Sequence, residues 1–107
     1  MSEDISKDII EKLLQRAKDT RDNAYTPYSE FKVGASVLVK EGKIFSGCNI
    51  ENAAYGLTIC AERVALFNAV AAGFKNIEIV FLLSDTEKLI TPCGSCRQVI
   101  SEFGKDI

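Results

Sequence analysis

Three cysteines and one glutamate are the residues of this chain whose types and spacing could do chemistry. Glu62 follows Cys60 by two residues, and a Pro-Cys-x-x-Cys segment supplies Cys93 and Cys96. Zinc binds thiolates in tetrahedral sites, and a catalytic site uses three protein ligands and leaves the fourth position for water or substrate. A carboxylate beside such a site can take a proton from the activated water. The pattern therefore predicts a hydrolytic Zn²⁺ centre held by Cys60, Cys93 and Cys96, with Glu62 as the catalytic acid–base.

Two other interpretations of the cysteines stay open. A Cys-x-x-Cys pair can be a redox pair or half of a structural zinc knuckle. A redox pair would leave Cys60 and Glu62 without a role. A closed structural site needs a fourth ligand, and the chain has no histidine, so Cys48 would be the remaining thiol. We interpret Cys48, at the end of an expected strand, as a small buried residue.

Length and composition restrict the class of protein. A chain of 107 residues with 47% hydrophobic and 26% charged residues predicts one globular domain. A net charge of −2 favours no nucleic-acid partner. No apolar stretch approaches the ~20 residues of a membrane span, and residues 1–12 do not resemble a signal peptide. Thiolates without a disulfide framework indicate the cytoplasm.

The expected elements follow the order α-β-β-α-β-α. Apolar residues at three- and four-residue steps predict a helix over residues 4–22. Two runs rich in β-branched and aromatic residues, Phe31–Val39 and Lys43–Ile50, predict a hairpin that turns at Glu41-Gly42. Such an order favours a three-layer domain in which helices pack on a sheet.

The second half of the chain completes this pattern. A second helix is expected from Cys60 to a stop at Gly73, and its apolar stripe would consist of Val64, Phe67, Val70 and Ala71. The run Ile77–Leu83 predicts a central buried strand. A last helix is expected to start near Cys93, just after a proline.

This arrangement places the predicted zinc ligands at the N-termini of helices. Cys60 and the Cys93/Cys96 pair would lie where unpaired N–H groups and the helix dipole favour negative charge. Three thiolates on Zn²⁺ leave a net charge of −1, which opposes ionisation of a bound water. Arg63 is the obvious cation to offset that charge, although it could also be an ordinary solvated helix arginine.

Four blocks of the sequence resemble the homotetrameric cytidine deaminases: Tyr28–Ala35, Gly47–Tyr55, Cys60–Arg63 and Pro92–Ile100. The cysteine and glutamate pattern also matches the all-cysteine form of the zinc deaminase signature. The resemblance implies a three-layer α/β/α fold whose mixed sheet has helices on both faces. It also implies hydrolysis of cytidine and 2′-deoxycytidine to the uridine nucleosides and ammonia, a reaction of pyrimidine salvage.

The resemblance also implies which residues bind the nucleoside. Asn49 and Glu51 would hold the ribose 3′-hydroxyl, and Phe31 would pack against the pyrimidine. The backbone at Ala61, together with Glu62, would bind the base. Residue type alone also allows Asn49 and Glu51 to be ordinary loop residues and Phe31 to be a core aromatic.

Further implied roles concern assembly and the surroundings of the metal. Tyr55 looks like the residue that each subunit of the family's tetramers contributes to a neighbouring subunit. Arg63 resembles the one that hydrogen-bonds the zinc-bound sulfurs, supported by Gln98. We therefore expect a homo-oligomer, most simply a tetramer, with Tyr55 and the loop Tyr25–Ser29 at its interfaces.

Two points qualify the resemblance. Family members continue with further strands and a C-terminal segment, so we expect residues 1–107 to be one deaminase-like domain without those strands. The alternative functions are a deaminase of another aminopyrimidine nucleoside, such as a blasticidin-type antibiotic, or a non-catalytic zinc-binding interaction module. The blasticidin family shares both cysteine blocks but lacks the stretch Asn49–Tyr55.

Overall fold

The computed structural model describes residues 7–54 and 57–84. Its elements are α1 (Lys7–Arg21), β1 (Val33–Val39), β2 (Ile44–Cys48), α2 (Ala61–Ala71) and β3 (Ile77–Ser84). These bounds confirm the expected first helix, hairpin, second helix and apolar strand to within a few residues. The expected helix near Cys93 lies outside the described residues.

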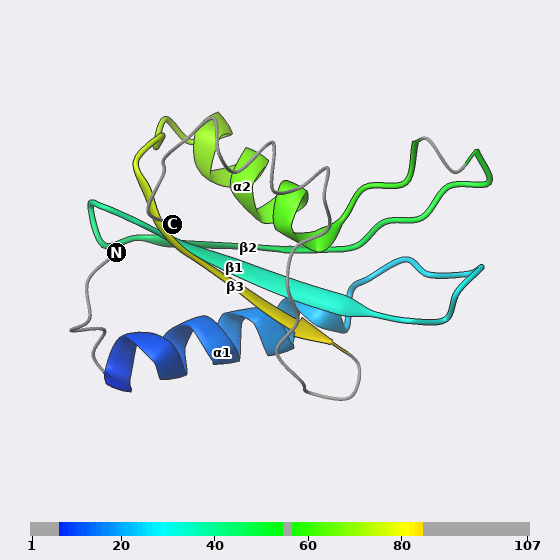
Figure 1. Ribbon diagram of the computed structural model, residues 1–107, viewed down its shortest axis with the longest axis horizontal. Coiled ribbons are helices and arrows are strands. Elements are labelled where there is room, and N and C mark those ends of the chain that lie inside the picture. Colours follow the sequence, from blue (N-terminus) through cyan, green and yellow to red (C-terminus); the bar gives the residue numbers. More distant parts are fainter. Residues whose placement is uncertain (1–6, 55–56, 85–107) are drawn as a thin grey trace.

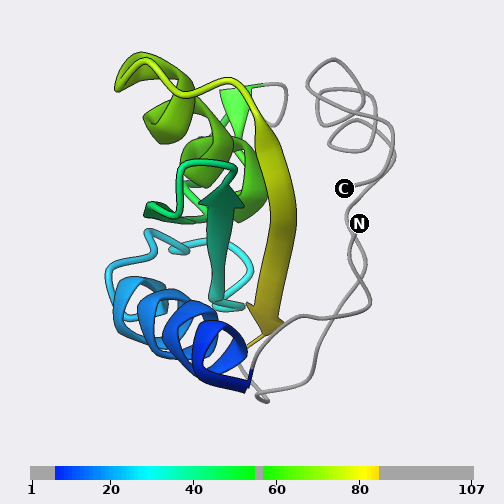
Figure 2. The same ribbon diagram turned by 90° about the vertical axis from the view of Figure 1, so that its left-hand side faces the viewer.

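The three strands form one sheet in the order β2-β1-β3, and both pairings are antiparallel. Ala35 of β1 lies opposite Gly47 of β2 on one side and Leu82 of β3 on the other, and β3 runs alongside β1 in Figure 2. Within residues 7–54 and 57–84 the central strand is therefore β1, whereas the sequence analysis placed Ile77–Leu83 at the centre. The middle of β3 is also only half-buried, at Ile79, Val80 and Phe81, so the apolar run alone did not give either the burial of this strand or the number of its neighbours. A mixed sheet would also need a parallel pair, and the strand pairs in the described part are all antiparallel.

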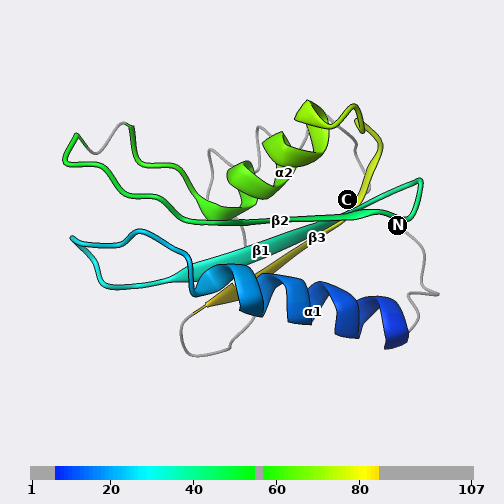
Figure 3. The same ribbon diagram turned by 180° about the vertical axis from the view of Figure 1, so that it is seen from behind.

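The two helices cover opposite faces of the sheet, which confirms the three-layer arrangement (Figures 1 and 3). On one face, Ala35, Val37 and Val39 of β1 form a buried core with α2. On the other face, the Ser36 hydroxyl donates a hydrogen bond of 2.7 Å to the carbonyl oxygen of Leu13 in α1. Alternate residues of β1 thus face different helices, as the pleat of a strand requires.

Glycines in the sheet let both helices approach closely. A Cβ atom at Gly34 would collide with the backbone of Ala17 in α1, and one at Gly47 would lie 2.8 Å from the carbonyl oxygen of Ala61 in α2. The start of α2 is therefore seated on β2 at Gly47. This contact fixes the height of the α2 N-terminus above the sheet.

The buried face of α2 differs from the predicted stripe of Val64, Phe67, Val70 and Ala71. Phe67 is 47% exposed, and Val64, Val70 and Ala71 are outside the buried set. The face in contact with the sheet consists of Ala61, Glu62, Ala65, Leu66 and Ala69. Apolar residues occur all round α2, so their period does not single out one face. Close packing on Gly47 selects the alanines, because larger side chains would not fit there.

The turns agree with the expectations from sequence. In the hairpin turn, the N–H of Gly42 donates to the carbonyl oxygen of Val39 at 2.9 Å. At the end of α2, Gly73 adopts a φ of 97°, and its N–H donates to the carbonyl oxygen of Val70 at 2.9 Å. A residue with positive φ commonly ends a helix, and glycine adopts it without strain. Among the described helices, none is both long and apolar enough to span a membrane.

Candidate active site

The N-terminus of α2 carries two of the predicted catalytic residues. Cys60 is the N-cap, with an extended backbone, and its carbonyl oxygen accepts hydrogen bonds from the N–H groups of Arg63 (3.1 Å) and Val64 (3.2 Å). Glu62 lies in the first turn and is only 5% exposed. A carboxylate is favoured there because the first N–H groups of a helix lack intrahelical acceptors. The structure thus brings Cys60 and a buried Glu62 together, as the spacing predicted.

Backbone pairing places the segment of Asn49 and Glu51 beside this helix start. Ile50 and Ile59 exchange two hydrogen bonds of 2.9 Å as an antiparallel bridge. On the other side, Tyr25 donates to the carbonyl oxygen of Asn49 (3.1 Å), and Glu51 donates to that of Tyr25 (2.8 Å). Because Ile59 immediately precedes Cys60, the bridge joins segment 49–51, which is predicted to bind the sugar, to the predicted zinc ligand. Local spacing in the sequence contains no signal for this pairing.

Asn49 has a bonding role that the sequence did not predict. Its Oδ1 accepts from the N–H of Val33, and its Nδ2 donates to the carbonyl oxygen of Phe31, both at 2.9 Å. The amide therefore fixes the chain as it enters β1 and holds Phe31 at the surface. Phe31 is 44% exposed, which contradicts the alternative of a core aromatic. The amide retains one N–H and one lone pair for a further partner.

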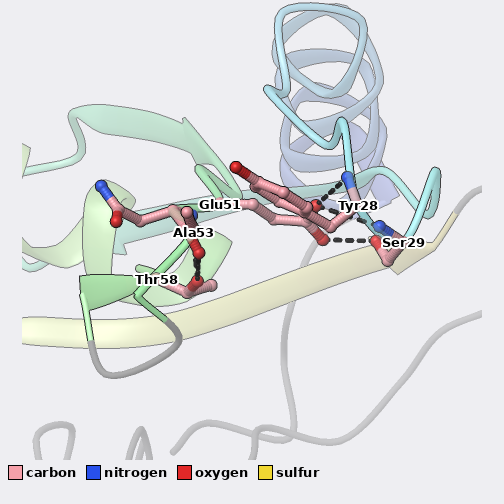
Figure 4. A pocket seen from close by; sticks show the side chains of 6 residues that line it. Tyr28, Ser29, Glu51, Ala53 and Thr58 are labelled. Atoms are coloured by element: carbon pink, nitrogen blue, oxygen red, sulfur yellow. Dashed lines mark hydrogen bonds between the residues drawn. The ribbon is translucent and has the colours of Figure 1, made fainter.

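The Glu51 carboxylate accepts three hydrogen bonds from two consecutive residues. Its Oε1 accepts from the N–H groups of Tyr28 (3.0 Å) and Ser29 (3.1 Å), and its Oε2 accepts from the Ser29 hydroxyl (Figure 4). The hydroxyl bond is the main cause that lowers the pKa of Glu51, desolvation opposes it, and the two backbone bonds lower it further. Glu51 is therefore an ionised acceptor at neutral pH.

A pocket of about 440 Å³ opens at this carboxylate, and its lining residues are Tyr28, Ser29, Glu51, Asn52, Ala53 and Thr58. Its size is in the range of small-molecule sites. Figure 4 shows Glu51 directed toward Tyr28 and Ser29, with Thr58 across the pocket. The Thr58 hydroxyl accepts from the N–H of Asn52 at 3.1 Å, which ties that wall together.

Sequence reasoning missed Ser29 and Thr58 as lining residues of the site. Ser29 is 22 residues from Glu51, and no periodicity connects the two. The only sequence signal is that Ser29 lies within the first of the four blocks that resemble the family.

The two cysteines among the described residues, Cys48 and Cys60, differ in burial and in position. Cys48 is buried at the end of β2, and burial raises the pKa of its thiol, which confirms a small buried residue. Cys60 is half-buried at a helix N-terminus, where a thiolate is favoured. Cys60 is thus suited to bind zinc. Arg63 in the same turn is partly buried and not fully exposed.

The other predicted ligands, Cys93 and Cys96, lie outside the described residues, as do Tyr55 and Gln98. Residues 7–54 and 57–84 contain no group of three or more side chains that could hold a metal by themselves. The predicted donor set takes only Cys60 from this part of the chain. The full ligand set therefore stays a prediction.

Comparison with known proteins identifies the family. The model of the cytidine and deoxycytidylate deaminase zinc-binding region matches residues 7–107. A cytidine deaminase of Sporosarcina psychrophila is 51% identical over 94 residues, which are 88% of this chain and 69% of that protein. The crystal structure of cytidine deaminase from Burkholderia pseudomallei has a TM-score of 0.83 and 48% identity, covering 94% of this chain and 79% of that one.

A blasticidin-S deaminase of Bacillus cereus is more distant, with 34% identity over 82 residues, which are 69% of this chain and 59% of that protein. The matched family model is a zinc-binding region, so Zn²⁺ is the cofactor. The resemblance inferred from the four sequence blocks is thereby confirmed. This chain belongs to the cytidine and deoxycytidylate deaminase family, whose zinc-binding region it contains.

Proposed function

We propose that this chain catalyses the hydrolysis of cytidine and 2′-deoxycytidine to uridine and 2′-deoxyuridine, with release of ammonia. The observation that carries the proposal is the placement of Cys60 and a buried Glu62 at the start of α2, bridged through Ile59 to the segment of Asn49 and Glu51. Sequence identities of 51% and 48% to two cytidine deaminases over most of the chain support this reaction.

In this proposal the metal is held by the thiolates of three residues, Cys60, Cys93 and Cys96. Zinc supplies a nucleophile at neutral pH by lowering the pKa of a water molecule. The N-terminus of α2 stabilises the Cys60 thiolate through its N–H groups and dipole. Arg63, one turn from Cys60 and partly buried, offsets the negative charge of three sulfurs with support from Gln98.

Glu62 moves the protons of the reaction. Its carboxylate accepts a proton from the attacking water as the C4–O bond forms, and it delivers that proton to N3 of cytosine. A second proton passes from the new hydroxyl through Glu62 to the amino nitrogen, and the C4–N bond then breaks to release ammonia. Glu62 is buried, with 5% of the residue exposed, so little water screens the interaction between its carboxylate and the groups that exchange protons with it.

The nucleoside is held by groups on both sides of the site. The ionised Glu51 and the remaining N–H of Asn49 bind the ribose 3′-hydroxyl. The exposed ring of Phe31 is available to pack on the pyrimidine. Ala61 is the first residue of α2, so its N–H has no intrahelical acceptor and can donate to the base.

The chain is proposed to act as a homo-oligomer, most simply a tetramer. Tyr25, Ile50 and Ile59 are bridge partners and are 58%, 43% and 36% exposed, so they form a continuous apolar strip that a second copy could cover. The Tyr25–Ser29 loop and Tyr55 would lie at such interfaces. Use of thiolates as metal ligands supports a cytoplasmic enzyme of pyrimidine salvage.

The reaction is tested by following the absorbance of cytidine and, separately, of blasticidin S with the zinc-loaded protein. Cytidine turnover in the wild type and a loss of about 10²–10⁴-fold in Glu62→Gln are expected, because the amide cannot shuttle a proton. Preference for blasticidin S would identify the other deaminase class. Zinc-loaded, folded protein that turns over neither substrate would favour the interaction module.

The ligand set is tested by metal analysis of two cysteine variants. Cys60→Ala should lose zinc, whereas Cys48→Ala should retain it because the Cys48 thiol is buried and its pKa is raised. Equal loss of zinc from both variants would contradict the three-thiolate assignment.

A further inference from the structure

We propose that Ser29 is a positioning residue of the nucleoside site, whose hydroxyl orients the Glu51 carboxylate toward the sugar. The inference rests on the proposed function, because it concerns the same substrate. The sequence assigned no role of this kind to Ser29, and the contact joins two segments that lie 22 residues apart.

The Ser29 hydroxyl lies at the centre of a small network. It donates to Oε2 of Glu51 and accepts from the N–H of Phe31 at 3.0 Å. One hydroxyl group therefore links the residue proposed to bind the sugar with the residue proposed to pack on the base. Because the Asn49 amide also holds the backbone of Phe31, loss of the Ser29 hydroxyl should displace the Glu51 carboxylate and leave the ring of Phe31 in place.

The two carboxylate oxygens of Glu51 have different surroundings. Oε1 accepts two backbone hydrogen bonds, from Tyr28 and Ser29, and these occupy both of its lone pairs. Oε2 accepts only the Ser29 hydroxyl among the described contacts. Oε2 thus retains one lone pair, and it is the oxygen that can accept a sugar hydroxyl.

The hydroxyl bond also determines the orientation of that lone pair. Two donors on Oε1 hold that oxygen but do not contact Oε2, whose position could still change with small adjustments of the Glu51 side chain. The bond from Ser29 to Oε2 removes this freedom and prepares the acceptor before substrate arrives. The lowered pKa of Glu51, caused mainly by the same bond, is consistent with this role.

A purely structural role for Ser29 would give a different kinetic pattern. If the hydroxyl only held the 25–31 loop together, its loss would lower stability and affect all substrates equally. A positioning role predicts instead an effect on KM that depends on the sugar hydroxyl. Substrates with and without that hydroxyl therefore separate the two roles.

The first experiment measures KM and kcat of Ser29→Ala with cytidine and with 2′,3′-dideoxycytidine. KM for cytidine should rise about tenfold, which corresponds to about 1.4 kcal/mol and to one hydrogen bond, while kcat changes little. KM for the dideoxy substrate should stay at the wild-type value. An equal rise for both substrates, or no rise for cytidine, would overturn the proposal.

Two further variants serve as controls. Ser29→Thr keeps the hydroxyl at an exposed position and should restore the wild-type KM. Ser46→Ala removes a matched hydroxyl, which accepts a bond of 2.8 Å from Thr20 between α1 and β2. It should leave KM unchanged for both substrates.

A second measurement does not depend on turnover. The N–H groups of Tyr28 and Ser29 donate to the Glu51 carboxylate, so their amide proton resonances report its position. The Tyr28 resonance should move in Ser29→Ala and stay unchanged in Ser46→Ala. If the wild type does not deaminate cytidine, the proposed function fails, and a Tyr28 resonance that moves still supports the link to Glu51. An unchanged Tyr28 resonance in Ser29→Ala would refute the link itself.

Discussion

Replacement of Gly47 by alanine should displace the start of α2 and with it the catalytic residues. The added Cβ would lie 2.8 Å from both the carbonyl oxygen of Ala61 and the carbonyl carbon of Val64, and nearer still to the backbone nitrogen of Ala65. Ordinary contact begins at 3.4 Å and the Ala65 nitrogen would lie at 2.4 Å, so the helix must move away by about 1.0 Å. All three atoms belong to the backbone of α2, and none can rotate out of the way.

Two quantities follow from this displacement. Overpacking of this kind costs about 1–3 kcal/mol of folding free energy, which urea unfolding measures. Because Cys60 and Glu62 move with the helix, kcat for cytidine should fall about 10- to 100-fold, in line with the sensitivity of catalysis to small misplacements.

The matched control is Gly73→Ala at the other end of α2. Gly73 has a φ of 97° and no atom within 4 Å of an added Cβ, so alanine there introduces backbone strain of about 1–2 kcal/mol without a collision. The control should lose comparable stability and keep kcat within about twofold once corrected for unfolded protein. If Gly47→Ala also keeps its kcat, the close contact of α2 with Gly47 does not position the catalytic residues, and the explanation is refuted.

Three further predictions concern other residues of the site and its support. Burial raises the pKa of the Cys48 thiol above its ordinary 9.0, so the stability that the thiol contributes is present below pH 9.0 and is lost as the pH rises through the raised value. Cys48→Ala should therefore show a smaller alkaline loss of stability in urea unfolding. An unchanged dependence of stability on pH would contradict this. The pKa of Glu51 lies below its ordinary 4.5, so the stability that its carboxylate contributes is present above pH 4.5 and is lost as the pH falls through the lowered value. Acid unfolding of Glu51→Gln should lack this loss of stability. An acid-unfolding curve identical to that of the wild type would argue against it. Phe31→Ala should change stability by less than about 0.5 kcal/mol because the ring is 44% exposed, yet raise KM for cytidine about tenfold through lost stacking; a large loss of stability with a normal KM would restore the core interpretation.

Local patterns in the sequence were sufficient to predict the parts of the fold that depend on near neighbours. The helical period of α1, the turn at Gly42 and the start of α2 just after Cys60 are all encoded within a few residues. The burial of Cys48 followed from its place at the end of an apolar strand. The adjacency of Cys60 and Glu62 required only their spacing and a helix N-terminus.

Contacts between distant segments could not be predicted in this way. The bridge between Ile50 and Ile59 and the bonds from Ser29 to Glu51 depend on how separate loops meet in space. The buried face of α2 was predicted wrongly for a related reason. Its composition is apolar on all sides, and the choice among faces is made by Gly47 in a different element.

In the proposed reaction, a water molecule deprotonated by Glu62 replaces the amino group at C4 of cytidine. The most direct test incubates zinc-loaded protein with cytidine in water enriched in oxygen-18 and analyses the nucleoside product by mass spectrometry. We expect uridine that carries one oxygen-18 atom, an equal amount of ammonia, and almost no product from Glu62→Gln. Uridine without the label, or labelled uridine formed equally fast by Glu62→Gln, would contradict it.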